Sequence, residues 1–553
     1  SQTLEHLGLV AAMFDELGIG ELVDELIPQD FEQRSITLGQ AMKAMVLNGL
    51  GFANRRLYLM PEFFENKPTE RLLGEGVSPE QINDDALGKA LDKLYDFGPS
   101  ELYSVIASRA ARRLQVEPKI GHLDTTSFHV DGRYNSEVEV SETEEAGLIR
   151  LTKGYSRDHR DDLNQVVLEL IVEHQASLPM LMRPLSGNTS DKLAFEHSIR
   201  EHVGQLQWAV QAQQPTQQPA GVEMIVTDNA AFTEGCLKAY DRQGLGWVMS
   251  VPATVKEAKD RLRGVEAARL GPLTEGYSYT PIRTTYAGVA QRWLLIYSQA
   301  ARERNQKKVD KQLFERTETE RKAFEKLCRE PFHCPEDAHR ALSAFQERKL
   351  DLLQIQDAGI VSQAHYRGPG RPATDSAPAS ITHHIRGALA APVGRREQYL
   401  LRRSCFILAT NTLDEESLTD VEVLELYKGQ SRAERGFRFL KDPMFMASTL
   451  YLKKVERVMA VLMVMTVCLL VYAALEYRIR NTLREHERAS VPDQKGKPTT
   501  RPTARWVFEM FEDVHLLTVG AGEVVIEKLV LNLRGELETL LRLLGPSYAR
   551  LYS

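Results

Sequence analysis

The sequence predicts an α/β fold, on the evidence of one run of strands and helices in the first half of the chain. Three β-prone segments, at 120–130, 164–174 and 179–185, follow one another and favour an antiparallel meander. A helix after SGNTSD, a buried strand ending at Asp228, a helix near 231–242 and a further strand come next. Three strands, a helix, a strand, a helix and a strand are the order of a ribonuclease H-like core.

The chain, at 553 residues, is too long for a single hydrophobic core, so we expect several domains. Residues 1–115 are predicted to form a helical N-terminal domain. The ribonuclease H-like core is predicted in two parts, 116–250 and 411–485. A mixed strand and helical insertion domain is expected between them at 251–410, and a helical C-terminal region over 486–553.

The N-terminal domain is predicted from apolar residues at helical spacing. They recur in AMKAMVLNGLGF and again in DALGKALDKLYDFGPSELYSVIASRAARRL, with short breaks at GVSP and FGPS. The last of these helices ends in a basic cluster of Arg109, Arg112 and Arg113. Such a cluster suits a helical DNA-binding module, and a helical bundle that only packs fits the same residues.

Two aspartates stand out within the predicted sheet. Asp124 lies inside the first strand, where aspartate is disfavoured, and Asp228 lies at the tip of the fourth. In a ribonuclease H-like order these two strands are neighbours. Paired carboxylates suit Mg²⁺ or Mn²⁺, which prefer oxygen ligands. The alternatives are a strand-end cap for Asp124 and a turn residue for Asp228.

The insertion is predicted to hold a strand pair in PIRTTYAGVAQRWLLIYS and a charged helical hairpin over 300–353. ITHHIRGAL and QYLLRRSCFILATN are predicted as further strands. Before these strands, and after the hairpin, a Gly/Pro-rich loop carries Arg367 and Arg371, which can enter a narrow minor groove or simply belong to a linker. At the end of the chain, VIEKLVLNLRGELETLLRLL is predicted as one amphipathic helix.

The stretch from Tyr427 to Lys441 places one carboxylate, Glu434, among several bases. Tyr427 precedes Glu434 by seven residues and Lys441 follows it by seven, so on a helix the three side chains form one stripe. Gly429 can interrupt that helix. The segment fits a metal ligand surrounded by phosphate-binding bases, and it also fits an amphipathic helix with a solvated charged face.

The overall charge of −7 does not indicate a nucleic-acid binder, but binding depends on local patches. The segment from Tyr427 to Arg457 contains eight basic residues and three acidic ones. Five scattered cysteines fit a reducing cytoplasm. The uncharged run from Val458 to Leu475 is just long enough to span a bilayer. Because nothing else in the chain suggests a membrane, we expect a buried core helix there.

These motifs resemble a known family, the insertion-sequence DDE transposases of the IS-four superfamily. The residues that carry the resemblance are Asp124 in LDTTSFHV, Asp228 in IVTDNAAF, and the spacing of Tyr427, Glu434 and Lys441, which fits the family signature Y-x2-R-x3-E-x6-K. GYSRDHRDDLNQVVLEL, SGNTSD, GFRFLKDP and INDDALGKALDKLYD resemble the IS-sixteen-thirty-four branch. Gln430 stands at the arginine position of the signature, and Arg432 is the candidate to replace its phosphate contact.

The resemblance implies a bacterial, cytoplasmic, nucleoid-associated enzyme that cuts and joins DNA. Asp124, Asp228 and Glu434 would be catalytic residues and would bind two divalent metal ions, Mg²⁺ or Mn²⁺. The partners would be double-stranded transposon ends, target DNA and a second copy of the chain. Phosphates would be held without reading the sequence. The residues expected to contact DNA are Tyr427, Arg432, Arg435, Arg438 and Lys441, with Arg367 and Arg371 in the loop and Trp247 and Trp293 as stacking partners for a flipped base.

Two other functions remain open from the sequence. One is a metal-dependent nuclease of the same fold, which would not transfer strands to a 3′-hydroxyl end. The other is a catalytically inactive DNA-binding protein derived from a transposase, although the presence of all three acids argues against it.

Overall fold

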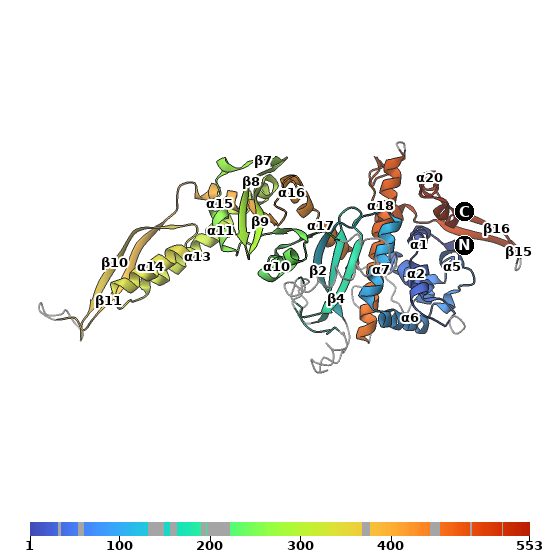
Figure 1. Ribbon diagram of the computed structural model, residues 1–553, viewed down its shortest axis with the longest axis horizontal. Helices are drawn as coiled ribbons and strands as arrows, with labels where there is room; N and C mark the ends of the chain where they lie inside the picture. The colour runs from blue at the N-terminus through green and yellow to red at the C-terminus, as the bar shows by residue number, and fades with distance from the viewer. Residues whose placement is uncertain are drawn as a thin grey trace.

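The computed structural model describes residues 1–30, 35–52, 60–130, 149–154, 163–189, 195, 222–367, 377–442, 454–486, 489–521 and 524–553. The molecule is elongated (Figure 1). A helical unit built around one long helix lies at one end, a large sheet lies in the middle, and a narrow arm extends from the other end.

A nine-stranded mixed sheet joins the predicted core to the predicted insertion. Its strand order is β4-β3-β2-β5-β6-β12-β9-β8-β7. The strands are β2 (Ile120–Val130), β3 (Asn164–Glu173), β4 (Pro179–Ser186), β5 (Met224–Thr227), β6 (Gly246–Ser250), β7 (Gly271–Thr274), β8 (Tyr277–Tyr286), β9 (Val289–Ser298) and β12 (Cys405–Thr410). The three strands β2, β3 and β4 form the predicted antiparallel meander.

The middle of this sheet is parallel, because β5 pairs in parallel with both β2 and β6. β12 then pairs antiparallel with β6 and with β9. Strands from the segment 251–410 therefore continue the core sheet, and only the arm stands apart from it. The sheet is flanked by η3 (Asn229–Ala231), α10 (Glu234–Arg242), α11 (Lys256–Arg263), η4 (Ala267–Arg269), α15 (Arg395–Arg403), α16 (Asp420–Lys428) and α17 (Ser431–Leu440).

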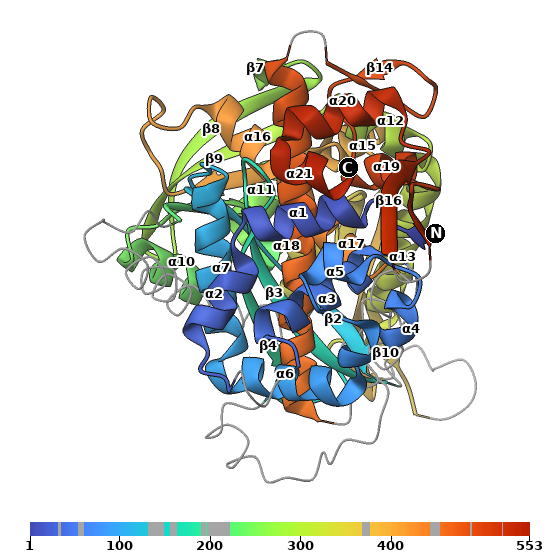
Figure 2. The ribbon, with the colours of Figure 1, turned by 90° about the vertical axis from the view of Figure 1, so that its right-hand side faces the viewer.

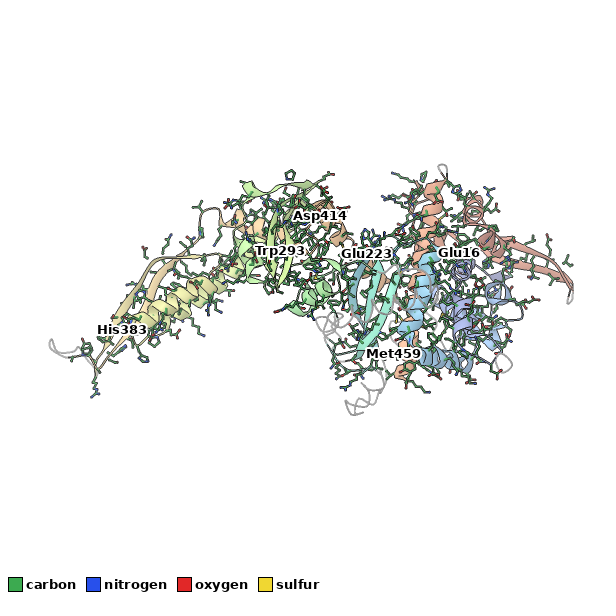
Figure 3. All side chains as sticks on the ribbon, in the orientation of Figure 1. Glu16, Glu223, Trp293, His383, Asp414 and Met459 are labelled. Carbon is green, nitrogen blue, oxygen red and sulfur yellow. The ribbon has the colours of Figure 1, made fainter. Side chains whose placement is uncertain are left out.

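The arm consists of two strands covered by two helices. β10 (Gln354–His365) and β11 (Ser380–Ala390) pair antiparallel, and α13 (Val309–Arg329) and α14 (Pro335–Arg348) pack on them around Phe324 and Phe345. The short helix α12 (Gln299–Gln306) leads into the arm. Figure 3 shows His383 far out on this arm, well away from Trp293 in the sheet. The prediction of a strand over QYLLRR is wrong, because those residues lie in α15.

One apolar helix, α18 (Val455–Glu485), organises the helical unit. It is long and apolar enough to cross a membrane by length and composition, and 89% of its most apolar window is buried inside the protein. A helix that is apolar all round needs neighbours on every side, and Figure 1 shows helices on one side of it and β2 to β4 on the other. The helices are α1 (Leu7–Glu16), α2 (Ile19–Leu26), α3 (Leu38–Leu50), α4 (Met60–Phe64), α5 (Thr69–Leu73), η2 (Pro79–Gln81), α6 (Asp84–Phe97) and α7 (Pro99–Arg113).

The two ends of the chain close the same unit (Figure 2). β1 (Gln2–Thr3) pairs with β15 (His515–Ala521), which pairs with β16 (Val524–Leu531). The prediction of one helix through VIEKLVLNLRGELETLLRLL is therefore wrong in its first half, which is strand β16. The remaining elements are β13 (Val491–Pro492), β14 (Pro498–Thr499), α19 (Ala504–Met510), α20 (Gly535–Leu544) and α21 (Pro546–Leu551).

Candidate active site

Asp124 and Asp228 come from neighbouring parallel strands of the sheet. β2 and β5 pair with His122 opposite Val226, and continuing that register by two residues puts Asp228 opposite Asp124. Adjacent strands are about 5 Å apart. Asp228 directly follows β5 and keeps an extended backbone, with φ −76° and ψ −174°. The two predicted acids therefore lie side by side where β5 ends.

Both aspartates accept local backbone hydrogen bonds. A carboxylate oxygen of the buried Asp124 accepts the N–H of Thr125 at 2.8 Å. Asp228 caps η3 by accepting the N–H of Ala230 at 2.9 Å. Such bonds favour the ionised form of a carboxyl group. Because a carboxylate has about four lone-pair sites, the capping role does not exclude a role as a metal ligand.

Asp124 lies on the face of β2 that carries α17. On this face His122 contacts Gln430, the residue before α17, and Phe128 contacts Lys441 at its end. The Lys441 ammonium lies 5.9 Å from the Phe128 ring centroid. Side chains alternate along a strand, so Asp124 shares the face of His122 and Phe128.

Glu434 lies level with Asp124 along this face. It is four residues beyond Gln430, which on a helix is an advance of about 6 Å. The same advance along β2 is about two residues at 3.3 Å each, which leads from His122 to Asp124. Glu434 is exposed in the first turn of α17, so it borders both the sheet and solvent.

The start of α16 is fixed to the sheet by a buried ion pair. Thr419 and Glu422 form a reciprocal capping box at its first turn. Asp420 accepts a hydrogen bond from the fully buried Arg292 of β9 at 2.5 Å, and another from the hydroxyl of Tyr279 at 2.8 Å. These contacts fix the position of α16 on the sheet, and with it the position of Tyr427 near the end of the helix.

The predicted break between the two helices falls at Gly429 and Gln430. A Cβ at Gly429 would come within 2.8 Å of the ring of His122 and 3.0 Å of the ring of His174. Only glycine therefore allows this close approach of the helix junction to β2. Gln430 N–H bonds to the carbonyl of Tyr427, and the backbone stays in the helical region through the junction.

Gln430 clamps this junction onto β2. It is buried, and its Nε2 donates to the carbonyl of Leu123, the residue before Asp124, at 2.9 Å. Its Oε1 must then accept from Nδ1 of His122, 3.3 Å away. Nε2 of a neutral His122 is consequently the acceptor for Nδ1–H of His174 at 2.8 Å. We call this chain of hydrogen bonds the Gln430 clamp.

The histidines of the Gln430 clamp are held neutral. Burial lowers the pKa of His122 to about 3, and the charges of His174 and Arg432 act in the same direction. Burial also lowers the pKa of His174, helped by Arg432. Neutral rings match the donor and acceptor order of the Gln430 clamp.

Tyr427 lies near enough to Asp228 and Glu434 for both charges to act on its phenol. Burial raises the pKa of its phenol, and the negative charges of Asp228 and Glu434 raise it further, whereas a hydrogen bond with Ser250 lowers it. Its ring stacks on Phe406 of β12, with 6.4 Å between centroids. The phenol therefore lies within the electrostatic field of both carboxylates.

The predicted phosphate-binding residues divide between two faces of α17. Arg438 is exposed on the side of Glu434, together with Lys441 near Phe128. Arg432 points to the opposite side, since two helical positions turn the side chain by about 200°. There its Nη1 donates to the hydroxyl of Ser177 at 3.3 Å. Arg435 is exposed between these faces.

The remaining predicted contacts lie away from this site. Trp247 and Trp293 are fully buried in the hydrophobic core between the sheet and its helices. Trp293 donates its ring N–H to Gln291 at 2.7 Å. Neither ring presents a face to DNA, which corrects the prediction that they stack on a flipped base. Arg367 is exposed at the end of the arm, and Arg371 lies outside the described residues.

A metal site must be judged on the donor atoms present. Asp124, Asp228 and Glu434 supply only carboxylate oxygens, the ligands that Mg²⁺ and Mn²⁺ prefer. Within the described ranges, however, no three His, Cys, Asp or Glu side chains lie close enough together to hold an ion. The two aspartates fit as a neighbouring pair on the sheet, and Glu434, on the helix along the same face, does not complete a cluster with them.

Sequence reasoning missed His122, His174 and the role of Gln430. One signal was available, since Gln430 replaces an arginine within a recognisable motif. A second was the polar residue His122 two positions before Asp124 in a strand that is otherwise mostly apolar or hydroxyl-bearing.

Comparisons with known proteins identify the family. A family model described as "Transposase DDE domain" matches residues 150–471, a range that includes Asp228 and Glu434 and begins after Asp124. A model described as "Domain of unknown function (DUF4277)" matches residues 1–108. No curated protein matches. One similar solved structure is the piggyBac transposase synaptic complex with hairpin DNA, at 9% identity over 92% of this chain and 80% of that chain, with a TM-score of 0.36. Because the "Transposase DDE domain" model matches more than half of this chain, the chain belongs to the DDE-domain transposases.

Proposed function

We propose that this protein is a cut-and-paste transposase that cleaves DNA at the ends of its element and joins the 3′-hydroxyl ends to target DNA. The observation that carries the proposal is the register of β2 and β5, which makes Asp124 and Asp228 neighbours on the sheet. The placement of α17 along the same face of β2 supports Glu434 as the third acid. The order β4-β3-β2-β5-β6, with β2, β5 and β6 parallel, supports a ribonuclease H-like core.

Asp124, Asp228 and Glu434 are the residues that would hold two Mg²⁺ or Mn²⁺ ions. Bound ions would activate water, polarise the scissile phosphate and stabilise the leaving oxygen. In the first step a water oxygen bonds to phosphorus while the bond to the 3′ oxygen breaks, which leaves a 3′-hydroxyl. In the second step that hydroxyl attacks a target phosphate, and the target's own 3′ oxygen leaves.

The bases around the acids would hold the DNA in place. Arg435, Arg438 and Lys441 lie on or beside the exposed face of α17 and are suited to phosphate contacts, which position DNA without reading its sequence. Tyr427 can donate its hydroxyl to a phosphate oxygen, because its pKa is raised and the phenol stays protonated. Two copies of the chain would pair two ends, and Arg367 at the arm's end is a further candidate DNA contact.

The test is substitution of Glu434 with glutamine. Glu434→Gln removes one negative charge and one metal ligand while the side chain keeps its length. We expect Mg²⁺- or Mn²⁺-dependent cleavage of the element's inverted-repeat ends to be lost, by at least about a hundredfold. Binding to the same ends, measured by fluorescence anisotropy in EDTA, should be retained.

The matched control is Glu425→Gln on α16, an exposed glutamate paired with Lys428. It should cleave at the wild-type rate. Metal-dependent nicking by Glu434→Gln at the control rate would refute the role given to Glu434. Cleavage without joining of the 3′-hydroxyl ends would identify a nuclease of the same fold instead of a transposase.

A further inference from the structure

An arginine-lined pocket lies behind α17, on the side opposite Glu434. It has a volume of about 500 Å³ between α17, α18, the turn from β3 to β4 and the segment before α19. We call it the arginine pocket. The five arginines that line it are Arg432, Arg435, Arg480, Arg484 and Arg501.

The positive charge of this pocket is not balanced from within. Glu476 is the carboxylate in its lining, and it is already engaged by Arg480 at 2.8 Å and by the N–H of Ala504 at 3.0 Å. Arg484 donates to the neutral side chain of Asn481 at 2.7 Å. Among the described lining residues five guanidinium groups therefore share one carboxylate, while the buried Glu173 outside the lining also attracts Arg432. Positive charge remains in excess, and a polyanion would relieve the repulsion.

Arg432 provides the buried end of the pocket. Its Nη1 donates to the Ser177 hydroxyl, while its Nε is buried without a hydrogen-bond partner among the described residues. Burial and the charge of Arg435 both lower the pKa of Arg432. A buried guanidinium N–H without a partner is costly and is satisfied well by a phosphate oxygen.

The pocket is small, with a volume of about 500 Å³, which suits a short segment of single strand better than a duplex. α17 and α18 pack closely here, since a Cβ at Gly436 would be 3.1 Å from Leu469. Packed helix axes lie about 8–10 Å apart, so no duplex can enter between α17 and α18. Tyr472 and Tyr477 also line the pocket. Arginines combined with aromatic rings are typical of sites for single-stranded DNA.

Arg435 connects the arginine pocket with the side of α17 that carries Glu434. Arg435 follows Glu434 directly and lines the pocket, so one exposed edge of α17 connects the two sites. The width of a helix with its side chains is about 10 Å, which corresponds to about three nucleotides. A strand cut beside Glu434 can therefore reach the pocket with its next few nucleotides.

We propose that the arginine pocket binds the phosphodiester backbone of an unpaired DNA strand next to the cleavage point. The proposal rests on the proposed function in DNA cleavage. It assigns Arg432 to this strand and Arg438 and Lys441 to the DNA beside the acids.

The experiment measures DNA binding by the full chain in EDTA, so that no cleavage occurs. The probes are a blunt duplex, the same duplex with a five-nucleotide single-stranded overhang, and inorganic phosphate as a competitor. The variant is Arg484→Gln/Arg501→Gln, which removes two exposed guanidinium groups of the pocket. The control Arg269→Gln/Arg283→Gln makes the same charge change on the exposed surface near the far edge of the sheet.

We expect the wild type and the control to prefer the overhang, and the pocket variant to lose that preference. The slope of log affinity against log salt should fall by about 1.4 for the overhang probe, which is about 0.7 per phosphate contact. Between 50 and 200 mM salt that change is about sevenfold. Equal loss on blunt and overhang DNA, or no loss on either, would overturn the proposal.

Two outcomes separate this proposal from the proposed function. In the first, millimolar inorganic phosphate at constant ionic strength displaces the overhang probe as effectively as unlabelled overhang DNA does. That result would identify a site for free phosphate and overturn strand binding. If the wild type fails to cleave DNA but still prefers the overhang through Arg484 and Arg501, the pocket is upheld and the cleavage function is not.

Discussion

Replacing Gln430 with methionine tests whether the Gln430 clamp positions the third acid. Methionine has a similar length and removes both the donor to the Leu123 carbonyl and the acceptor for His122. Each buried hydrogen bond contributes about 1 kcal/mol net, so we expect a loss of about 2 kcal/mol in the free energy of unfolding. The Leu123 carbonyl directly precedes Asp124, so the same change releases α17 from the strand that carries the first acid.

The effect on catalysis follows from that release. If the full 2 kcal/mol is needed to hold Glu434 in place for the transition state, the cleavage rate at saturating DNA falls about 30-fold. Affinity for DNA in EDTA should change by less than about threefold, because Arg438 and Lys441 remain on the exposed side of the helix. Raising the Mn²⁺ concentration should recover part of the rate.

Gln291→Met is a matched control for this variant. Gln291 is also buried and also makes two hydrogen bonds, accepting from Trp293 at 2.7 Å and donating to the carbonyl of Tyr286 at 3.2 Å. It should lower the unfolding free energy by a similar amount without slowing cleavage at a temperature where both variants are folded. Equal cleavage rates for the two variants would refute the positioning role of the Gln430 clamp.

Two further predictions concern stability. Burial lowers the pKa of His6 to about 4, below its unfolded value near 6.5, so the unfolded state binds more protons between these pH values. In urea unfolding, this group should therefore lower the free energy of unfolding by up to about 1.4 kcal/mol per pH unit as the pH drops from 6.5 to 4. His6→Gln should remove this pH-dependent part of the stability. His365→Gln, at an exposed position, should leave it unchanged. Arg292→Met leaves Asp420, whose side chain is 11% exposed, without its ion pair and should cost about 3 kcal/mol, measured by denaturant unfolding. Arg321→Met, which breaks only exposed pairs with Glu318 and Glu325, should change stability by less than about 1 kcal/mol.

The core of this fold could be predicted because its signals are local. Strands β2 to β6 are apolar runs bounded by turns. Asp124 interrupts one of these runs and Asp228 directly follows another, at positions that strand pairing makes adjacent. Thr419 caps the start of α16, and Gly429 lies at its end. Each of these features depends on a few neighbouring residues, which is the information that a sequence carries directly.

Other elements depend on partners far along the chain. The segment VIEKLVLNL has leucines and valines that suit a helix or a strand, and pairing of β16 with β15 decides for a strand. QYLLRR is a short apolar run whose state is likewise ambiguous, and it forms α15. The burial of Trp247 and Trp293 follows from the joining of the 251–410 strands to the core sheet, which no local pattern indicates.

The pairing of β1 with β15 also has a consequence for the synthesis of the chain. Tyr552 donates its hydroxyl to the carbonyl of Glu5 and accepts the N–H of Leu9, and β1 adds to the edge of β15. The opening helices therefore cannot finish packing until residues 515–552 have left the ribosome. During translation the apolar surfaces of α1 and α18 must be covered by each other or by chaperones until residues 515–552 have emerged. A nascent or prematurely stopped polypeptide would thus lack a completed helical unit, however well its central sheet had formed.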